Sequence, residues 1–180
     1  MITNLEKQNI YLHDNFFEEY HVIYDFVVEE FKKINPVYQD CGEAFFHLDF
    51  GFPEEWLDLL TKIGIFVEGK YGNPCSIKSN ALNLVVYEDG SYKEPHKDNL
   101  HVFLDENGLE IKEEFNYTSI FYLNDNFTGG KLKFDLLDVV IDPIPGRLVV
   151  FPSDLLHSVS KVGGGTRFIV NKFWRVKNEN

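Results

Sequence analysis

Residues 87–98 read YEDGSYKEPHKD and contain a histidine and an aspartate two positions apart, His96 and Asp98. If this pair ends an extended segment, the alternation of side chains along a strand places both on one face. A second histidine, His157, lies in a later stretch, residues 151–167, which also contains Arg167. Two imidazoles and one carboxylate on one side of a metal ion are the ligand set of non-haem iron(II) oxygenases. We therefore predict a metal site formed by His96, Asp98 and His157.

The short motif alone is weak evidence. With six histidines and 29 acidic residues in 180 positions, about one His-x-Asp/Glu arrangement is expected by chance. The sequence contains a second one, His47 with Asp49, inside the aromatic run AFFHLDF. A histidine in such a run is more often half-buried and hydrogen-bonded than bound to a metal. The surrounding sequence therefore favours His96 over His47 as the metal ligand.

Length and composition limit the class of protein. A chain of 180 residues with 44% hydrophobic residues is expected to form a single domain, 1–180, with a core that needs no disulfide or metal. The net charge of −12 argues against nucleic acid and anionic membranes as partners. The sequence starts without an apolar signal core and has no apolar run of membrane-spanning length, so a cytoplasmic location is expected. Cys41 and Cys75 are interpreted as ordinary thiols.

The first part of the chain, about 1–76, has the apolar periodicity of helices. Apolar residues at intervals of three and four predict a helix over 14–34, capped by Asp14 and ended by Pro36. A second helix is predicted over 53–63, with Gly64 at its end.

The second part, about 77–176, has short β-type runs separated by turn residues, which predict an antiparallel sandwich or barrel. The predicted strands are Leu82–Tyr87, Thr118–Leu123, Lys131–Asp135, Arg147–Phe151 and Arg167–Trp174. Gly129-Gly130 is a hairpin signal, and residues 143–146 form a turn. Residues 99–116 are charged and expected to be irregular. They are interpreted either as a solvated insertion or as a lid over the metal.

Several motifs occur together and in a particular order. They are Tyr87-x-x-Gly90 with Pro95-His96-x-Asp98, FYLND at 121–125 with GGKLKF at 129–134, PGRLVVFPS at 145–153, HSVSKV at 157–162 and GTR at 165–167. In this order the stretch 77–174 resembles the iron(II)- and 2-oxoglutarate-dependent dioxygenases, and within them the prolyl 4-hydroxylase-like branch. The resemblance implies a mainly β fold, a double-stranded β-helix (a jelly-roll or cupin-like barrel) with N-terminal helices packed on one sheet.

The resemblance also implies cofactors and further site residues. Iron(II), 2-oxoglutarate and O₂ are expected, with ascorbate as a further cofactor that the resemblance allows. Arg167 would bind the distal carboxylate of 2-oxoglutarate, since a guanidinium offers a planar, permanently charged fork. Tyr122 would donate to the same carboxylate. Tyr87 would either contact the other end of the cosubstrate or fill the barrel.

Two positions depart from the branch pattern. Lys93 stands where the branch often has a tyrosine, and Tyr92, one place earlier, would point to the other side of a strand. The glycines at 163–165 lengthen the turn between His157 and Arg167.

The expected activity is hydroxylation of an unactivated carbon, first of all in a prolyl residue of a peptide or protein. Asp98 favours hydroxylation over halogenation, because the related halogenases lack this carboxylate. A free amino acid or other small metabolite is the alternative substrate, and the acidic surface favours a basic or neutral partner. From another class, a cupin-type barrel would bind metal without 2-oxoglutarate chemistry. An inactive interaction module is disfavoured, because all three ligands and Arg167 are present.

Overall fold

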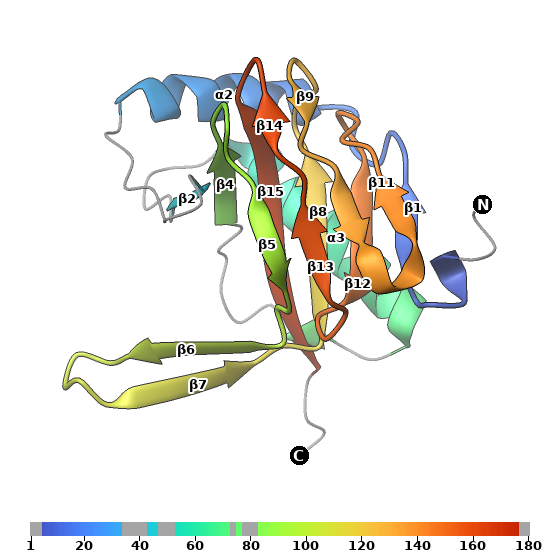
Figure 1. Ribbon diagram of the computed structural model, residues 1–180, viewed down its shortest axis with the longest axis vertical. Coiled ribbons are helices and arrows are strands. Elements are labelled where there is room, and N and C mark those ends of the chain that lie inside the picture. The colour runs from blue at the N-terminus through green and yellow to red at the C-terminus, as the bar shows by residue number, and fades with distance from the viewer. Residues whose placement is uncertain (1–4, 34–42, 47–52, 73–74, 77–82, 177–180) are drawn as a thin grey trace.

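The computed structural model describes residues 5–33, 43–46, 53–72, 75–76 and 83–176, and its main feature is a pair of β-sheets (Figure 1). All strand pairs are antiparallel. The larger sheet has the order β1 (Tyr11–His13), β12 (Leu148–Pro152), β8 (Tyr117–Tyr122), β15 (Arg167–Val176), β4 (Asn83–Tyr87) and β2 (Glu43–Phe46), with β3 (Cys75–Ser76) paired to β15. The smaller has the order β11 (Val139–Ile141), β10 (Leu132–Phe134), β13 (His157–Val159) and β5 (Lys93–His96).

Two further strand pairs extend this frame. The short pair β9 (Thr128–Gly129) and β14 (Val162–Gly163) lies at one end of the barrel, and a 3₁₀ turn, η1 (Asp135–Leu137), follows β10. The hairpin β6 (Leu100–Leu104) with β7 (Glu110–Glu114) projects from the opposite end (Figure 1).

The buried side chains form two apolar layers, because successive residues of the larger sheet point to opposite faces. One layer lies between the sheets and includes Val85, Ile120, Val149, Ile169 and, from the smaller sheet, Leu132, Phe134, Ile141 and Val159. The other includes Leu84, Phe121, Leu148 and Val170, packed against helices α2 (Tyr20–Lys33) and α3 (Glu54–Tyr71). The prediction of a mainly β fold with N-terminal helices on one sheet is confirmed, and the five predicted strands appear as β4, β8, β10, β12 and β15.

The predicted helix boundaries are partly wrong. α2 begins at Tyr20 rather than at Asp14, because the preceding residues form β1 and a turn in which the Phe16 N–H donates to the Gly146 carbonyl. Asp14 does not cap the helix but pairs with Arg147. α3 continues past Gly64, which is buried inside it, and ends at Tyr71, followed by Gly72 in a left-handed conformation. The free energy gained by packing one face of α3 against the sheet exceeds the cost of a glycine inside a helix.

Two loop predictions also need correction. Gly129 and Gly130 do not form a hairpin turn, since β9 pairs with β14 and not with β10. The stretch 99–116 is not irregular, because β6 and β7 make a continuous ladder from Leu100 opposite Glu114 to Leu104 opposite Glu110. The turn predicted at 143–146 lies one residue later, at Ile144–Arg147, where the Arg147 N–H donates to the Ile144 carbonyl. No helix in the described part of the chain is long and apolar enough to cross a membrane.

Candidate metal centre

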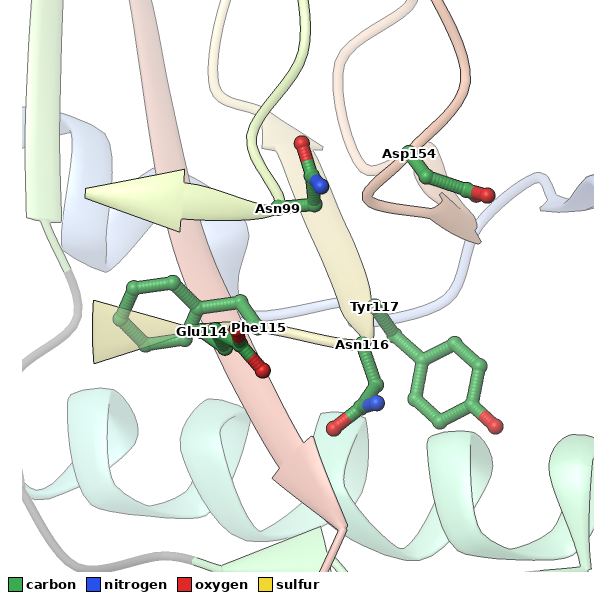
Figure 2. A pocket seen from close by; sticks show the side chains of 6 residues that line it. All are labelled: Asn99, Glu114, Phe115, Asn116, Tyr117 and Asp154. Carbon is green, nitrogen blue, oxygen red and sulfur yellow. The ribbon is translucent and has the colours of Figure 1, made fainter. Parts of the chain in front are cut away.

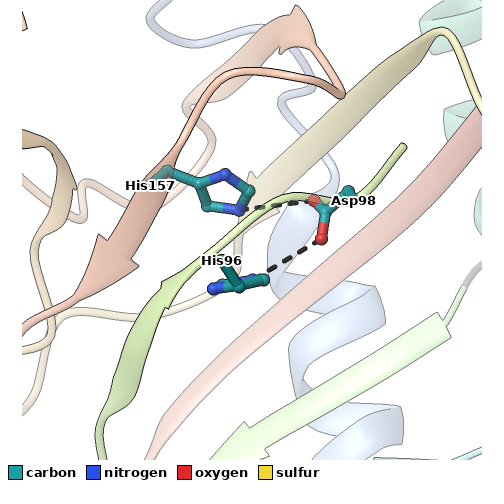
Figure 3. A group of neighbouring side chains, drawn as sticks. All are labelled: His96, Asp98 and His157. Carbon is teal, nitrogen blue, oxygen red and sulfur yellow. Dashed lines mark ion pairs between the residues drawn. The ribbon is translucent and has the colours of Figure 1, made fainter. Parts of the chain in front are cut away.

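The three residues predicted to bind a metal come together at two neighbouring strands and the bend that follows one of them (Figure 3). His96 ends β5 and His157 begins β13, and the two are direct partners in the ladder. Asp98 follows two residues after His96. One candidate ligand atom from each side chain lies within 4.8 Å of the other two. The rival pair, His47 and Asp49, and Cys41 lie outside the described residues.

Backbone hydrogen bonds orient both imidazole rings. The Nδ1 of His96 is 2.8 Å from the Glu94 carbonyl oxygen, and that of His157 is 2.9 Å from the Leu155 carbonyl oxygen. A carbonyl can only accept, so each Nδ1 is assigned the proton and each Nε2 keeps its lone pair. These Nε2 atoms lie 3.5 Å and 3.3 Å from the two carboxylate oxygens of Asp98. Neighbouring ligands of an octahedral ion are about 3 Å apart, so the donor set fits a divalent metal.

Asp98 is buried and held by its neighbours. The Thr118 hydroxyl donates to Asp98 Oδ2 at 3.0 Å and lies 2.9 Å from the Ser153 hydroxyl, while the Asp98 N–H donates to the Ser153 carbonyl at 2.8 Å. Burial raises the pKa of Asp98, but His157, His96 and the Thr118 hydrogen bond outweigh it and hold the pKa below its usual value. The carboxylate is therefore ionised, as a metal ligand must be. No motif in the sequence pointed to Thr118 or Ser153 as partners of Asp98.

The imidazole of His96 is held neutral. Burial, and next the neighbouring His157, lower the pKa of His96 below its usual value, while Asp98 acts in the opposite direction. The ring of His157 packs against Phe151 at 4.8 Å and Phe134 at 6.0 Å between centroids. Both phenylalanines belong to the layer between the sheets, so one side of the centre is apolar and excludes water.

A buried cation lies in the same interior. The guanidinium of Arg167 is fully buried, with its carbon 4.8 Å from the ring centroid of Tyr87 and 5.3 Å from that of Tyr122. Within the described part of the chain, none of its three nitrogens makes a hydrogen bond of ordinary geometry, and neither does the Tyr122 hydroxyl, although the two groups lie close enough for the guanidinium to favour the ionised phenol. Burial raises the pKa of Tyr122, although the charge of Arg167 works against it, so the phenol keeps its proton. Unbalanced donors of this kind fit a bound anion.

The family assignment rests on a sequence comparison. Residues 82–175, more than half of the chain, match the family model described as the 2OG-Fe(II) oxygenase superfamily. The chain belongs to this superfamily. Iron(II) and 2-oxoglutarate are accordingly its metal and its cosubstrate, and the three-residue donor set and the unbalanced guanidinium suit these two groups respectively. A search of curated proteins found no match.

Solved structures of prolyl hydroxylases share the fold of this oxygenase. A prolyl-4-hydroxylase from Pseudomonas putida superimposes with a TM-score of 0.74 at 17% identity, covering 98% of this chain and 97% of that one. A viral collagen prolyl hydroxylase from Paramecium bursaria Chlorella virus-1, in complex with 2OG, gives 0.69 at 18%, covering 94% and 96%. A prolyl hydroxylase from Trichoplax adhaerens, in complex with a hypoxia inducible factor peptide fragment, gives 0.70 at 18%, covering 96% and 86%.

In this oxygenase Gly130 packs directly against the side chain of the buried Arg167. A Cβ atom at Gly130 would lie 2.9 Å from Arg167 Cδ and 2.8 Å from a ring carbon of Phe127. Gly130 also has φ +61°, which favours glycine. The sequence signal was present in Gly129-Gly130, but it was interpreted as a hairpin. Tyr92, by contrast, is 41% exposed and lies just before β5.

Proposed function

We propose that this oxygenase hydroxylates a prolyl residue in a peptide or protein. In this proposal His96, Asp98 and His157 hold iron(II), and Arg167 with Tyr122 binds the distal carboxylate of 2-oxoglutarate. The observation that carries the proposal is the fully buried guanidinium of Arg167, whose nitrogens lack acceptors among the described residues. A cupin-type barrel that only binds a metal would have no use for such a cation. Tyr87 is proposed to support Arg167 through its ring, 4.8 Å from the guanidinium carbon.

When bound, iron(II) and 2-oxoglutarate supply the oxidative chemistry: O₂ is consumed, one oxygen atom enters the C–H bond of the substrate, and the other enters succinate as carbon dioxide is released. The protein's own groups bind and orient. Thr118 and Ser153 hold the carboxylate of Asp98, and the backbone carbonyls hold both imidazoles. Phe134 and Phe151 keep water from that side of the centre.

Two features support a peptide or protein as the substrate: the fold shared with prolyl hydroxylases and the projecting hairpin. The three prolyl hydroxylases share this fold over most of their length, and one of them is in complex with a peptide. The projecting hairpin β6–β7 also gives this short chain a surface that a free amino acid would not need.

The first experiment is anaerobic titration of the apoprotein with iron(II) and then 2-oxoglutarate. We expect a weak visible charge-transfer band that forms only when the 2-oxo acid chelates iron. His157→Ala should remove it, whereas His21→Ala, a change at a histidine on α2, should not. Iron binding without this band in the wild type would contradict the cosubstrate assignment.

The second experiment concerns the substrate. Proline-containing peptides and free proline are each incubated with the iron-loaded enzyme, 2-oxoglutarate and O₂, and mass spectrometry detects the added oxygen atom. We expect oxygen in the peptides, with one succinate formed for each oxygen added. Turnover of free proline with none of the peptides modified would overturn the peptide assignment in favour of a small-molecule hydroxylase.

A further inference from the structure

One face of the hairpin β6–β7 carries a row of apolar side chains that is open to solvent. Leu100, Val102 and Leu104 are 46%, 52% and 68% exposed. They alternate along β6, so they lie on one face together with their ladder partners Glu114, Lys112 and Glu110. Such an apolar alternation usually marks a buried face of a sheet, and where it stays exposed it marks an interaction site.

The opposite face of the hairpin is fixed to the barrel. The ring of His101 packs at 4.9 Å against Phe115 and at 4.4 Å against Phe173 of β15. Glu113 makes a 2.7 Å ion pair with Arg175. The hairpin is therefore anchored through this face, which leaves the row of Leu100, Val102 and Leu104 outward.

A hollow of about 360 Å³ lies at the base of the hairpin (Figure 2). Its lining residues are Asn99, Glu114, Phe115, Asn116, Tyr117 and Asp154. Glu114 belongs to both features, because it lines the hollow and lies directly opposite Leu100 in the ladder. The apolar row therefore continues into the hollow on the same face of the hairpin.

The charges of the hollow select for a cation. Two acids of the hairpin are already neutralised, Glu110 by Lys112 at 3.0 Å and Glu113 by Arg175 at 2.7 Å. Glu114 and Asp154 have no ion-pair partner within the described ranges. These two carboxylates suit the guanidinium of an arginine or the ammonium of a lysine. The aromatic rings of the hollow are already covered, because Arg175 lies 4.8 Å from the Phe115 ring centroid and Tyr117 stacks on Tyr71.

We propose that this face docks an extended segment of the peptide substrate with two apolar side chains at alternate positions, followed on the same face by an arginine or lysine. The apolar side chains would cover Leu100, Val102 and Leu104, and the basic one would enter the hollow between Glu114 and Asp154. Asn99, which also lines the hollow, directly follows Asp98, so the docked segment lies beside the metal centre. This assignment rests on the proposed function, because it names the segment as part of the substrate.

The test is binding, which needs no turnover. A fluorescein-labelled peptide with the core Val-Ser-Val-Ser-Arg is titrated with the enzyme and followed by anisotropy. The control peptide Val-Ser-Val-Arg-Ser has the same composition and charge, but its arginine points to the other face of a strand. We expect the first peptide to bind about tenfold more tightly. Equal binding of the two would overturn the docking geometry.

Matched variants separate this site from general attraction to an acidic protein. Glu114→Gln with Asp154→Asn should weaken binding about tenfold, whereas Glu18→Gln with Asp125→Asn changes net charge equally and should have almost no effect. Val102→Thr should weaken binding about threefold, whereas Val140→Thr, at a valine with similar exposure of 54% on β11, should not. Equal losses in both members of a pair would contradict the proposal.

A second copy of the chain is the rival occupant. If the wild type is a dimer by light scattering and Val102→Thr makes it a monomer, the face is a dimer interface and the proposal is overturned. Failure of the proposed function would be recognised separately. In that case mass spectrometry would find no oxygen added to any peptide, or the charge-transfer band would be absent in the wild type, while the two peptides could still be distinguished by anisotropy.

Discussion

At the scale of single residues, the protein carries charges in places where folding alone would not put them. Arg167 is fully buried without an acceptor among the described residues, and Lys172 is also buried, with its ammonium 5.3 Å from the Trp174 ring. The two lie on opposite faces of β15, since Arg167 faces the barrel interior and Lys172 points towards the helices. Each therefore has its own consequence for stability.

Arg167→Met should have opposite effects on stability and on binding. Without cosubstrate, the variant should gain about 1 to 4 kcal/mol in unfolding free energy, because an unbalanced buried charge is replaced by an apolar chain. Its affinity for 2-oxoglutarate should fall about 30-fold or more, with iron binding unchanged. Urea denaturation and the anaerobic titration measure the two effects. A variant less stable than the wild type would mean that a protein group already balances Arg167.

Lys172→Met should change how stability depends on pH. Burial lowers the pKa of Lys172 to about 8 from 10.5. Between these values the unfolded state binds more protons than the folded state, so this residue makes stability rise with pH across that window. At pH 7 the variant should be more stable than the wild type by up to about 3 kcal/mol.

The difference between the Lys172→Met variant and the wild type should shrink as the pH rises from 8 to 10. Urea denaturation at several pH values measures it. A constant difference across this range would show that Lys172 keeps an ordinary pKa in the folded protein.

At the scale of elements, the strand pair β9 and β14 is followed on each strand by a glycine, and the one after β9, Gly130, packs against Arg167. Gly130, just after β9, has no room for a Cβ beside Arg167, whereas a Cβ at Gly164, just after β14, would meet nothing within 4 Å. The two glycines have nearly the same backbone conformation, with φ of +61° and +68°. They form a matched pair in which only one approaches the proposed cosubstrate site.

Gly130→Ala and Gly164→Ala should each lose about 1 kcal/mol of stability, because both place alanine in the left-handed region. Gly130→Ala should lose more than Gly164→Ala, because its Cβ must also displace Phe127 and Arg167. Only Gly130→Ala should weaken 2-oxoglutarate binding, by about tenfold or more, because it displaces the guanidinium. Thermal denaturation and the charge-transfer titration measure these effects. If both variants bind 2-oxoglutarate like the wild type, Gly130 does not position Arg167.

The same scale explains what the sequence could predict. The strands β4, β8, β12 and β15 were recognisable because both of their faces are buried, which makes them continuous apolar runs. The hairpin β6–β7 was missed, because its apolar alternation is mixed with acidic residues and one face stays exposed. The end of α3 was missed because Gly64 has the residue type of a helix end, while its burial depends on the sheet below it.

The centre itself was predictable only in part. The spacing of His96 and Asp98 and the presence of His157 indicate the ligands, but the ladder that makes the two histidines direct partners is a long-range pairing. Thr118 and Ser153 lie on or next to other strands and carry no local signal. Residue types can indicate which groups bind a metal, whereas their supports follow from topology.

At the scale of the whole molecule, the larger sheet separates two apolar layers, one against the helices and one between the two sheets. Among the residues that the structure describes, only the second layer contacts the metal centre. The helix-side layer contains Leu59, which is fully buried on α3. The layer between the sheets contains Phe134 and Phe151, which touch His157. A change in the helix-side layer should therefore affect folding and leave the centre intact.

Leu59→Ala should lower the unfolding free energy by about 2 to 5 kcal/mol, because it leaves a cavity between α3 and the sheet. Iron and 2-oxoglutarate affinities of the folded protein should stay unchanged. Leu57→Ala, at a half-exposed position of the same helix, is the control and should cost much less. A large loss of iron affinity in Leu59→Ala at a temperature where it is folded would show that the two layers are coupled.

The two halves of the proposed reaction chamber belong to different sheets. His96 and His157 lie on the smaller sheet, whereas Arg167, Tyr122 and Tyr87 lie on the larger one. The apolar layer between the sheets, which includes Leu132 and Val149, sets how far apart they stand. If Arg167 binds the distal carboxylate as proposed, the packing of this layer would help to set the length of 2-oxo acid that fits between metal and guanidinium. Larger or smaller side chains at Leu132 and Val149 would therefore change which 2-oxo acid binds, although every proposed binding residue stays the same.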